Sequence, residues 1–266
     1  MASNSSTVAL VTGASSGIGE SLARCFAQDG HDLILVARSA DKLKALAATL
    51  SAELGVKAWV EPADLAQPDA AQRLAATLRR KRRRVDVLVN NAGVLEQGAF
   101  ASMPTASHAQ MIQLNVAGLT ALLAELLPPM VARGSGRVLN VASIAAFQPI
   151  PSLATYAATK AYVLSLTESL SEELRGTGVT LTALCPGITA TGMLSKAREA
   201  NAQLNQLPDF LIGDVDDVAR QGFRACMRGD TICVPGVVNQ AAMLASRSTP
   251  KWLVRRLGGL MARQAL

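Results

Sequence analysis

Apolar positions along the chain follow two different spacings, and the two alternate from the start of the sequence to its end. Short, mostly apolar runs bounded by glycine, proline or polar residues predict strands. Segments in which apolar residues recur with a helical period predict helices. The expected strands cover 7–12, 31–38, 56–62, 85–91, 136–143, 178–187 and 231–236, and the expected helices cover 18–30, 41–54, 68–82, 107–132, 154–175 and 214–229.

Strands separated by helices of this length predict a parallel sheet with right-handed crossovers. The runs "DLILV" and "DVLVN" are apolar throughout, which is typical of strands whose two faces are both covered by helices. No repeat, low-complexity segment or linker interrupts the pattern. We therefore expect an α/β fold, a doubly wound parallel sheet of about seven strands with helices on both faces, formed by one domain over residues 1–266.

The ends and the apolar stretches of the chain predict a soluble protein. The first residues, "MASNSSTVALVTG", have no basic region before their short apolar run, so no signal peptide is expected. The most apolar stretch, "GLTALLAELLPPM", is interrupted by Glu125 and two prolines, and we expect no segment of membrane-spanning length.

The cysteines show neither CxxC spacing nor a paired pattern, and they favour a reducing cytoplasm. Only two histidines accompany them, so no metal site is expected. These residues are Cys25, Cys185, Cys226, Cys233, His31 and His108.

The net charge is +6, and the run "RRKRRR" at 79–84 contributes six basic residues. One interpretation is a patch for nucleic acid or an acidic partner. The other is a solvated helix end, where cations complement the helix dipole. No aromatic residues interleave with the run, as a nucleic-acid stacking surface would need, so we favour the helix end and expect no nucleic acid partner.

The first expected strand leads into "VTGASSGIGE", in which Gly13, Gly17 and Gly19 lie between a strand and a helix. Glycines in this position let the backbone approach a pyrophosphate at the helix N-terminus. The same letters "GASSG" also match the nucleophile elbow of α/β-hydrolases, with Ser15 as the nucleophile. That enzyme class needs a histidine late in the chain, and none follows His108, so we favour dinucleotide binding.

The second expected strand ends in "LVARS", with Ala37 and Arg38 where NAD-binding folds place an acidic residue. A carboxylate that would repel a 2′-phosphate is lacking, and Arg38 can pair with that phosphate. NADP(H) is therefore favoured over NAD(H). An ordinary surface arginine is the alternative interpretation.

The segment "YAATK" places Tyr156 and Lys160 four residues apart on an expected helix, so the phenol and the ammonium share a face. A free phenol with a pKa of about 10 is a poor base at neutral pH. A nearby positive charge favours tyrosinate, so that Tyr156 can exchange a proton with an alcohol or a developing alkoxide. Ser143 follows the strand "RVLNVA" and can donate to a substrate oxygen there.

Together these motifs resemble those of the short-chain dehydrogenase/reductase family. The set consists of "TGASSGIG", "NNAG" (90–93), Asn115, Ser143, "YAATK" and "PG" (186–187), in the family's order over roughly residues 7–238. The resemblance implies a Rossmann-type fold and nicotinamide-dependent interconversion of a carbonyl and an alcohol. It also implies a catalytic tetrad of Asn115, Ser143, Tyr156 and Lys160, in which Lys160 holds the nicotinamide ribose and Asn115 holds a water that relays protons to Lys160.

The same resemblance implies the residues that bind the cofactor. They surround the glycine motif, the adenine, the end of the fourth strand, the catalytic helix and the nicotinamide. The expected set is Gly13, Ser15, Ser16, Gly17, Ile18, Gly19, Arg38, Asp64, Leu65, Asn91, Ala92, Gly93, Tyr156, Lys160, Pro186, Gly187, Ile188 and Thr189.

Besides Ser143, the candidate substrate residues are apolar, which favours a hydrophobic ketone, aldehyde or secondary alcohol. They are Leu95, Ala145, Phe147, Ile150, Leu153, Met193 and Leu194. One alternative is a 3-oxoacyl thioester on an acidic carrier protein, with the basic run as its docking surface. Another is a regulatory protein that binds NADP without turnover.

Two further expectations concern assembly. The helices at 107–132 and 154–175 are apolar over more than one stripe, and because the family buries such helices between subunits, we expect a homodimer or homotetramer. The extension 239–266 is basic and, after Pro250, amphipathic. Docking of this extension on protein is favoured over contact with an anionic membrane surface.

Overall fold

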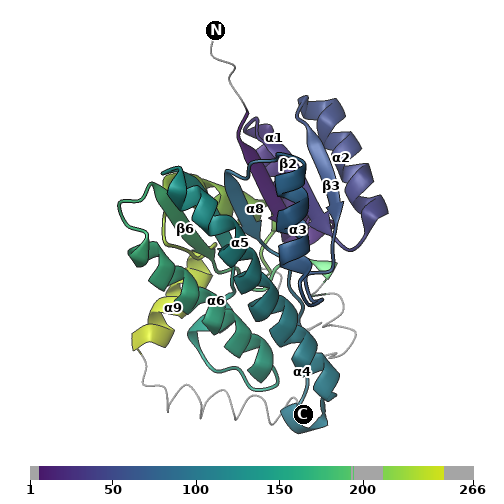
Figure 1. Cartoon of the computed structure of the whole chain (residues 1–266). Helices are drawn as coiled ribbons and strands as arrows, with labels where there is room; N and C mark the ends of the chain where they lie inside the picture. The colour runs from purple at the N-terminus through teal and green to yellow at the C-terminus, as the bar shows by residue number, and fades with distance from the viewer. Residues whose placement is uncertain (1–5, 193, 195–211, 249–266) are drawn as a thin grey trace.

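The computed structural model describes residues 6–192, 194 and 212–248. Its centre is a parallel sheet of seven strands in the order β3-β2-β1-β4-β5-β6-β7, as Figure 1 shows in part. The strands are β1 (Val8–Thr12), β2 (Asp32–Ala37), β3 (Ala58–Pro62), β4 (Val87–Asn90), β5 (Gly136–Val141), β6 (Val179–Leu184) and β7 (Ile232–Cys233). The predicted doubly wound parallel sheet is confirmed.

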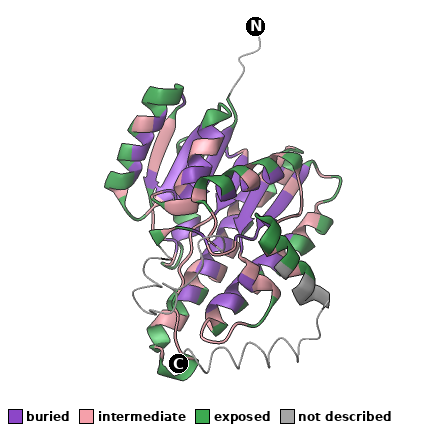
Figure 2. Cartoon of the chain, turned by 180° about the vertical axis from the view of Figure 1, so that it is seen from behind, coloured by how far each residue is buried: buried purple, intermediate pink, exposed green. Residues whose placement is uncertain are grey.

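Helices cover both faces of the sheet, because successive strand residues point to opposite sides and both sets are apolar. One face packs against α3 (Ala70–Arg80), α5 (Leu119–Ala132) and α6 (Ala154–Glu173). The other face packs against α1 (Gly17–Gln28), α2 (Ala40–Leu54) and α8 (Val215–Arg228). The central strands β1, β2 and β4 are almost entirely buried, whereas the edge strands β3 and β7 are mostly half-buried (Figure 2).

The long helix expected from Ser107 begins earlier and is interrupted. It comprises α4 (Thr105–Ile112), a π-helical segment η2 (Gln113–Gly118) and α5. A Cβ on Gly118 would lie 2.4 Å from the carbonyl oxygen of Leu65, so only glycine allows this close approach. The wider π turn lies at Asn115, as such segments often do at functional sites.

By length and composition, the helix Thr105–Ala132 is apolar enough to cross a membrane, which corrects the expectation based on Glu125 and the two prolines. Of its most apolar window, 39% is buried inside the structure. It lies in the middle of the chain, and α5 packs on α3 and β5. Core packing therefore accounts for one side of this helix.

The basic run lies at the end of α3, at the edge of the sheet where the strands begin. Four of its six cations have intramolecular partners: Arg79 pairs with Glu125 at 3.0 Å, Lys81 with Glu61 at 2.5 Å and Arg84 with Asp86 at 2.7 Å, while the Arg83 guanidinium lies 4.0 Å from the ring centre of Trp59. Arg80 and Arg82 are exposed. The run thus covers part of the edge strand β3, which carries Trp59 and Glu61.

The chain after β7 forms the helix α9 (Val237–Ser248), so the first part of the predicted extension 239–266 is helical. The amphipathic segment after Pro250 lies outside the described residues. The short helical turns η1 (Phe100–Ser102) and η3 (Ile144–Phe147) complete the described elements.

Candidate active site

The strand order reverses between β1 and β4, which are neighbours in the middle of the sheet. Loops leaving the carboxyl ends of two such strands turn to opposite faces, and ligands of doubly wound sheets bind in the crevice between them. The glycine motif follows β1, and "NNAG" follows β4. The topology therefore brings these two predicted motifs together.

The two loops are joined through the buried hydroxyl of Thr12. It donates to the carbonyl of Val89 at 3.1 Å and accepts from the backbone amides of Asn91 at 2.9 Å and Ala92 at 3.1 Å. The side chain of Asn91 returns a hydrogen bond to the Thr12 carbonyl at 2.9 Å. These bonds fix the glycine turn against the end of β4.

The three glycines of the motif are required at their positions for different geometric reasons. Gly13 and Gly17 have φ angles of 65° and 56°, which other residues rarely adopt. A Cβ on Gly19 would lie 2.3 Å from Nδ2 of Asn91. The side chain of Ser16, the residue before α1, makes no capping hydrogen bond in the described chain. The first amides of α1 can therefore bind an anion, and this turn fits the pyrophosphate of a dinucleotide.

An open hollow of about 420 Å³ lies between α1 and α2, beside the glycine turn. Ser15, Ser16, Arg24 and Lys42 are among the residues that line it. Arg24 is neutralised by Glu20 at 2.8 Å, so the hollow has a net positive charge from Lys42. The exposed Arg38 follows β2 directly.

Asp64 and Leu65, which the resemblance predicts beside the adenine, follow β3. The Asp64 carboxylate accepts from the amide of Ala66 at 3.1 Å, which fixes the turn. The side chain of Leu65 is buried, and its carbonyl faces Gly118 of the π segment. These residues lie near the carboxyl end of the sheet, like those of the glycine turn.

Helix α6 presents Tyr156 and Lys160 on its buried face, at 8% and 5% exposure. The Lys160 ammonium donates to the carbonyl of Val141 at 2.8 Å, at the end of β5. Ser143 follows β5 by two residues, and its Oγ accepts from the amide of Ala145 at 3.1 Å. The helix and the strand end thus bring three members of the predicted tetrad to the same edge of the sheet.

Asn115, the fourth member, is held in the π segment by three hydrogen bonds. Its Oδ1 accepts from the amide of Val94 at 2.9 Å, and its Nδ2 donates to the carbonyl of Val94 at 2.9 Å and to Thr159 Oγ1 at 3.1 Å. A Cβ on Gly93 would lie 3.2 Å from Asn115 Oδ1 and 3.5 Å from Lys160 Nζ. The Asn115 amide and the Lys160 ammonium therefore both lie close to the α-carbon of Gly93, and the gap between the two groups is about as wide as one small group.

The electrostatics of the tyrosine differ from the expectation. Burial raises the pKa of Tyr156 to about 12, although an interaction with the Ser143 side chain acts in the opposite direction. Burial lowers the pKa of Lys160 to about 8. The ammonium lies 5.8 Å from the centre of the phenol ring and is directed to Val141. Without cofactor, desolvation of the phenol outweighs the charge of the distant ammonium, and the expected stabilisation of tyrosinate by Lys160 and an oxidised nicotinamide stays a prediction for the complex.

The turn after β6, Pro186–Thr189, reaches the same edge. The amide of Ile144, next to Ser143, donates to the carbonyl of Pro186 at 2.9 Å. Thr189 Oγ1 donates to the Gly187 carbonyl at 3.0 Å, and Thr189 forms an isolated bridge with Gly213. The turn is therefore tied both to the Ser143 loop and to the segment that leads into α8.

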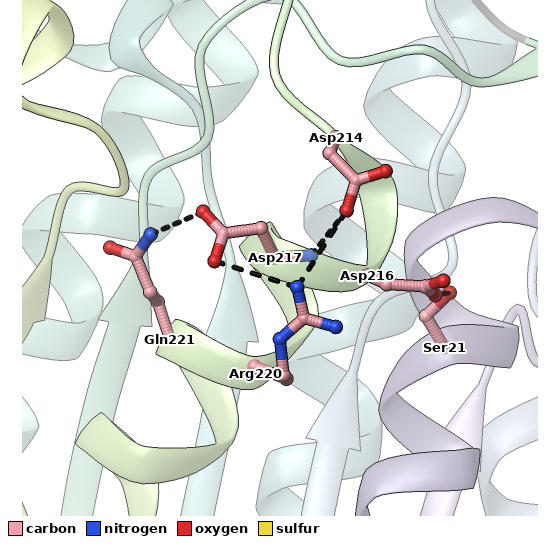
Figure 3. A network of polar contacts seen from close by, with 6 residues as sticks. All are labelled: Ser21, Asp214, Asp216, Asp217, Arg220 and Gln221. Carbon is pink, nitrogen blue, oxygen red and sulfur yellow. Dashed lines mark hydrogen bonds and ion pairs between the residues drawn. The ribbon is translucent and has the colours of Figure 1, made fainter.

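Figure 3 shows how α8 is fixed at its start. Asp214 caps the helix by accepting from the amide of Asp217 at 2.8 Å, and Asp217 also accepts from Gln221 at 2.7 Å. Ser21 of α1 donates to Asp216 at 2.7 Å. Since α1 begins at the glycine turn and α8 begins beside Thr189, this bond joins the two sides of the site.

Comparison with known proteins agrees with this arrangement. The family model described as short chain dehydrogenase matches residues 7–202. The chain belongs to the short-chain dehydrogenase/reductase family. Members of this family are oxidoreductases that bind NAD(P)(H), and the chain has the glycine turn and the tyrosine–lysine pair at one edge of the sheet.

Three similar proteins illustrate the relationship. The oxidoreductase UcpA of Escherichia coli K12 is 36% identical over 197 residues, covering 73% of this chain and 74% of the relative. A short-chain dehydrogenase from Sphingobium yanoikuyae in complex with NADPH is 33% identical, with a TM-score of 0.80, and the match covers 96% of this chain and 95% of the relative. The bulky-bulky ketone specific alcohol dehydrogenase from Comamonas testosteroni is 30% identical, with a TM-score of 0.76, and the match covers 92% of this chain and 95% of the relative.

The predicted substrate residues of this short-chain dehydrogenase/reductase separate into groups. Ala145 is buried in a small apolar cluster with Tyr156, and Leu95 and Ile150 pack against that cluster. Leu153 is half-buried directly before α6. Phe147 packs against the main core, and its role as a substrate residue stays a prediction. Met193 lies outside the described residues, and Leu194 is half-buried.

Sequence reasoning missed several residues that shape the site. Met111 lies in the Tyr156 cluster, and Val94 and Met103 pack against it. Thr12 and Thr159 hold the loop after β4 and the amide of Asn115. Both threonines stand within quoted motifs, "VTG" and "YAATK", but a motif does not reveal the partners of a buried hydroxyl.

Proposed function

We propose that this short-chain dehydrogenase/reductase is an NADP(H)-dependent enzyme that interconverts a carbonyl and a secondary alcohol on a hydrophobic substrate. The observation that carries the proposal is the meeting of Tyr156, Lys160 and Ser143 beside the glycine turn, where β1 and β4 end. A phenol, an ammonium and a hydroxyl at this edge provide what proton transfer next to a bound dinucleotide requires.

The residues have distinct roles in this proposal. Bound NADP(H) supplies the hydride acceptor or donor. Ser143 Oγ donates a hydrogen bond to the substrate oxygen and stabilises the charge that develops on it. Tyr156 gives its proton to that oxygen during reduction and takes it back during oxidation. The pKa of about 12 keeps the phenol protonated, which suits the reductive direction.

Lys160 and Asn115 support Tyr156. The Lys160 ammonium, held by Val141, binds the nicotinamide ribose and favours tyrosinate once the proton has left. Asn115 Oδ1 and Lys160 Nζ both face Gly93, because a Cβ on that glycine would lie 3.2 Å from the first and 3.5 Å from the second, and in this proposal a water in front of the glycine bridges the two groups. Such a water would return a proton to the site from Lys160.

The preference for NADP(H) is assigned to Arg38 with Lys42. Arg38 rather than a carboxylate directly follows β2, and Lys42 lines the hollow between α1 and α2 together with Ser15 and Ser16. The NADPH complex of the Sphingobium relative supports this choice. We expect a dissociation constant at least tenfold lower, about 1.4 kcal/mol, for NADPH than for NADH.

The cofactor assignment is tested by titrating both nucleotides into the Arg38→Ala and Lys42→Gln variants. Each substitution should reduce the preference. The matched control is Lys44→Gln on the same helix, because Lys44 is 70% exposed, pairs with Asp41 and does not line the hollow. Equal affinities for NADPH and NADH in the unaltered protein would refute the assignment.

The substrate side of the proposal rests on the apolar cluster around Tyr156. Ala145, Met111 and Ala157 are buried beside the phenol, and Val94, Leu95, Met103 and Ile150 pack against them. The Comamonas relative, by name an alcohol dehydrogenase specific for bulky ketones, supports an apolar carbonyl substrate. A panel of aliphatic and aromatic ketones, aldehydes and secondary alcohols, followed by NADPH absorbance, is the direct test.

The Tyr156→Phe variant completes this test. It should lose turnover while keeping cofactor affinity within about twofold, since the phenol acts on the proton and not on the nucleotide. Near-normal kcat in this variant would exclude Tyr156 as the proton donor. Tight NADPH binding without turnover of any panel compound would favour the regulatory alternative.

We also propose a cytoplasmic homodimer or homotetramer formed through α4, α5 and α6. Ile112 and Tyr162 are exposed large side chains on these helices, at 50% and 39%. Tyr162 and Thr120 form a hydrogen bond at 3.0 Å that connects α6 with α5. A second copy of this chain would cover the side of the long helix that faces away from the core.

A further inference from the structure

Helix α9 lies beyond residues 7–202, which the family model matches, yet it contacts both turns of the site. It packs against η3, the turn that directly follows Ser143. Met243 on its inner side packs against the main core. At its start, Asn239 touches Gly187 of the Pro186–Thr189 turn.

The contact between Asn239 and Gly187 is very close. A Cβ on Gly187 would lie 2.5 Å from both Nδ2 and Oδ1 of Asn239. The carboxamide therefore rests directly on the α-carbon of the glycine. Asn239 Nδ2 donates to the carbonyl of Pro235 at 2.8 Å, which anchors the amide to the loop between β7 and α9.

The carbonyl groups of Pro186, Gly187 and Ile188 in this turn are each held by a hydrogen bond. The Pro186 carbonyl accepts from Ile144 at 2.9 Å, and the Ile188 carbonyl accepts from Gly213 at 2.7 Å. The Gly187 carbonyl accepts from Thr189 at 3.0 Å. These bonds fix the carbonyl groups, whereas Asn239 supports the α-carbon of Gly187.

We propose that Asn239 is a positioning residue for the nicotinamide half of the cofactor. By resting on Gly187, it fixes the turn that the family resemblance assigns to the nicotinamide, and the inference depends on the NADP(H)-dependent function proposed above. A preordered turn saves the free energy that binding would otherwise spend on ordering it. Loss of the carboxamide should therefore weaken contacts to the nicotinamide half and leave the adenosine half unchanged.

The experiment compares two probes by titration calorimetry. NADPH carries both halves of the cofactor, and adenosine 2′,5′-bisphosphate carries only the adenosine half. In Asn239→Ala, the Kd for NADPH should rise about tenfold, while the Kd for the bisphosphate stays within about twofold. Asn239→Asp keeps the side-chain volume but loses the donor to Pro235, and it should show the same selective loss.

Gln240→Ala is the matched control. Gln240 donates to the carbonyl of Val234 at 3.0 Å, in the same loop between β7 and α9 that Asn239 binds. Its atoms are not among those nearest to a Cβ on Gly187. It should leave both dissociation constants unchanged. A reciprocal test adds a methyl group to the glycine. Gly187→Ala should weaken NADPH binding because its Cβ would meet Asn239, and adding Asn239→Ala should restore part of the affinity by removing the clash.

The possible results separate the two hypotheses. A selective rise in the Kd for NADPH supports a positioning role. An equal rise for both probes, or no change for either, overturns it. If the unaltered protein binds neither NADPH nor NADH, the proposed function itself fails. If it prefers NADH, the same comparison with NADH and AMP still tests Asn239.

Discussion

Replacing Lys160 by methionine gives a direct measure of the free energy needed to bury its charge. Methionine keeps a long unbranched side chain but removes the ammonium. The ammonium is buried at 5% exposure, with the carbonyl of Val141 as its hydrogen-bond partner at 2.8 Å. In the unaltered protein, burial lowers the pKa of Lys160 from 10.5 to about 8, and the neighbouring Cys185 acts in the opposite direction.

The expected magnitude follows from this pKa shift. One pKa unit corresponds to about 1.4 kcal/mol, so at pH 7, where Lys160 is charged in both states, burial of the charge lowers the free energy of unfolding by roughly 3 kcal/mol. The unfolded chain binds this proton more tightly than the folded chain. Stability therefore rises with pH between about 8 and 10.5, and about 2 kcal/mol is regained between pH 7 and pH 9.5.

Lys160→Met should lack this rise. The substitution leaves the Val141 carbonyl without its donor, which costs about 1–3 kcal/mol, but that cost does not depend on pH. The difference in free energy of unfolding between the unaltered protein and Lys160→Met should therefore increase by about 2 kcal/mol from pH 7 to pH 9.5.

Urea unfolding of the cofactor-free protein at several pH values measures this difference. Lys44→Met serves as the control, since Lys44 is 70% exposed, and its difference should stay constant with pH. A constant difference for Lys160→Met as well would mean that the ammonium is not desolvated in the folded protein. The reasoning from burial would then be refuted.

Three other expectations address the relay, the acid stability and the assembly. Gly93→Ala should lower kcat, because its methyl group would lie 3.2 Å from Asn115 Oδ1 and 3.5 Å from Lys160 Nζ; unchanged kcat would exclude a water that bridges these two groups beside Gly93. Burial lowers the pKa of His31 below 6.5, so the free energy of unfolding should fall as the pH drops below that value. In urea unfolding, His31→Leu should remove this fall. The same fall in both proteins would assign it to other groups. Ile112→Glu should convert the oligomer to monomer in light scattering; a monomeric unaltered protein would contradict the proposed interface.

The sheet could be predicted from sequence because its signal is local. Each buried strand is an unbroken apolar run, and a helix between each pair of consecutive strands favours a parallel sheet. The positions of Tyr156 and Lys160 on one helix face followed from their spacing alone. The glycine turn was equally visible, since a strand, three glycines and a helix occur in sequence.

The parts that could not be predicted depend on contacts between distant segments. The π segment at Asn115 is a local change of helical winding, and the Leu65 carbonyl that approaches Gly118 follows a different strand. The pKa of Tyr156 depends on the cluster that buries it, and the sequence argument counted the charge of Lys160 but not the desolvation. The role of Asn239 was invisible because its partner, Gly187, lies 52 positions earlier in the chain.

The position of the basic run also bears on the thioester alternative. The run lies where the strands begin, whereas Ser143 and Tyr156 lie where they end. Strand β1 has five residues, so at roughly 3.3 Å per residue the two edges are about 17 Å apart. An acidic carrier protein docked on the exposed Arg80 and Arg82 would be separated from Tyr156 by the whole sheet. The basic run is therefore better explained by its ion pairs and by the Trp59 ring that it covers than by docking of a carrier protein.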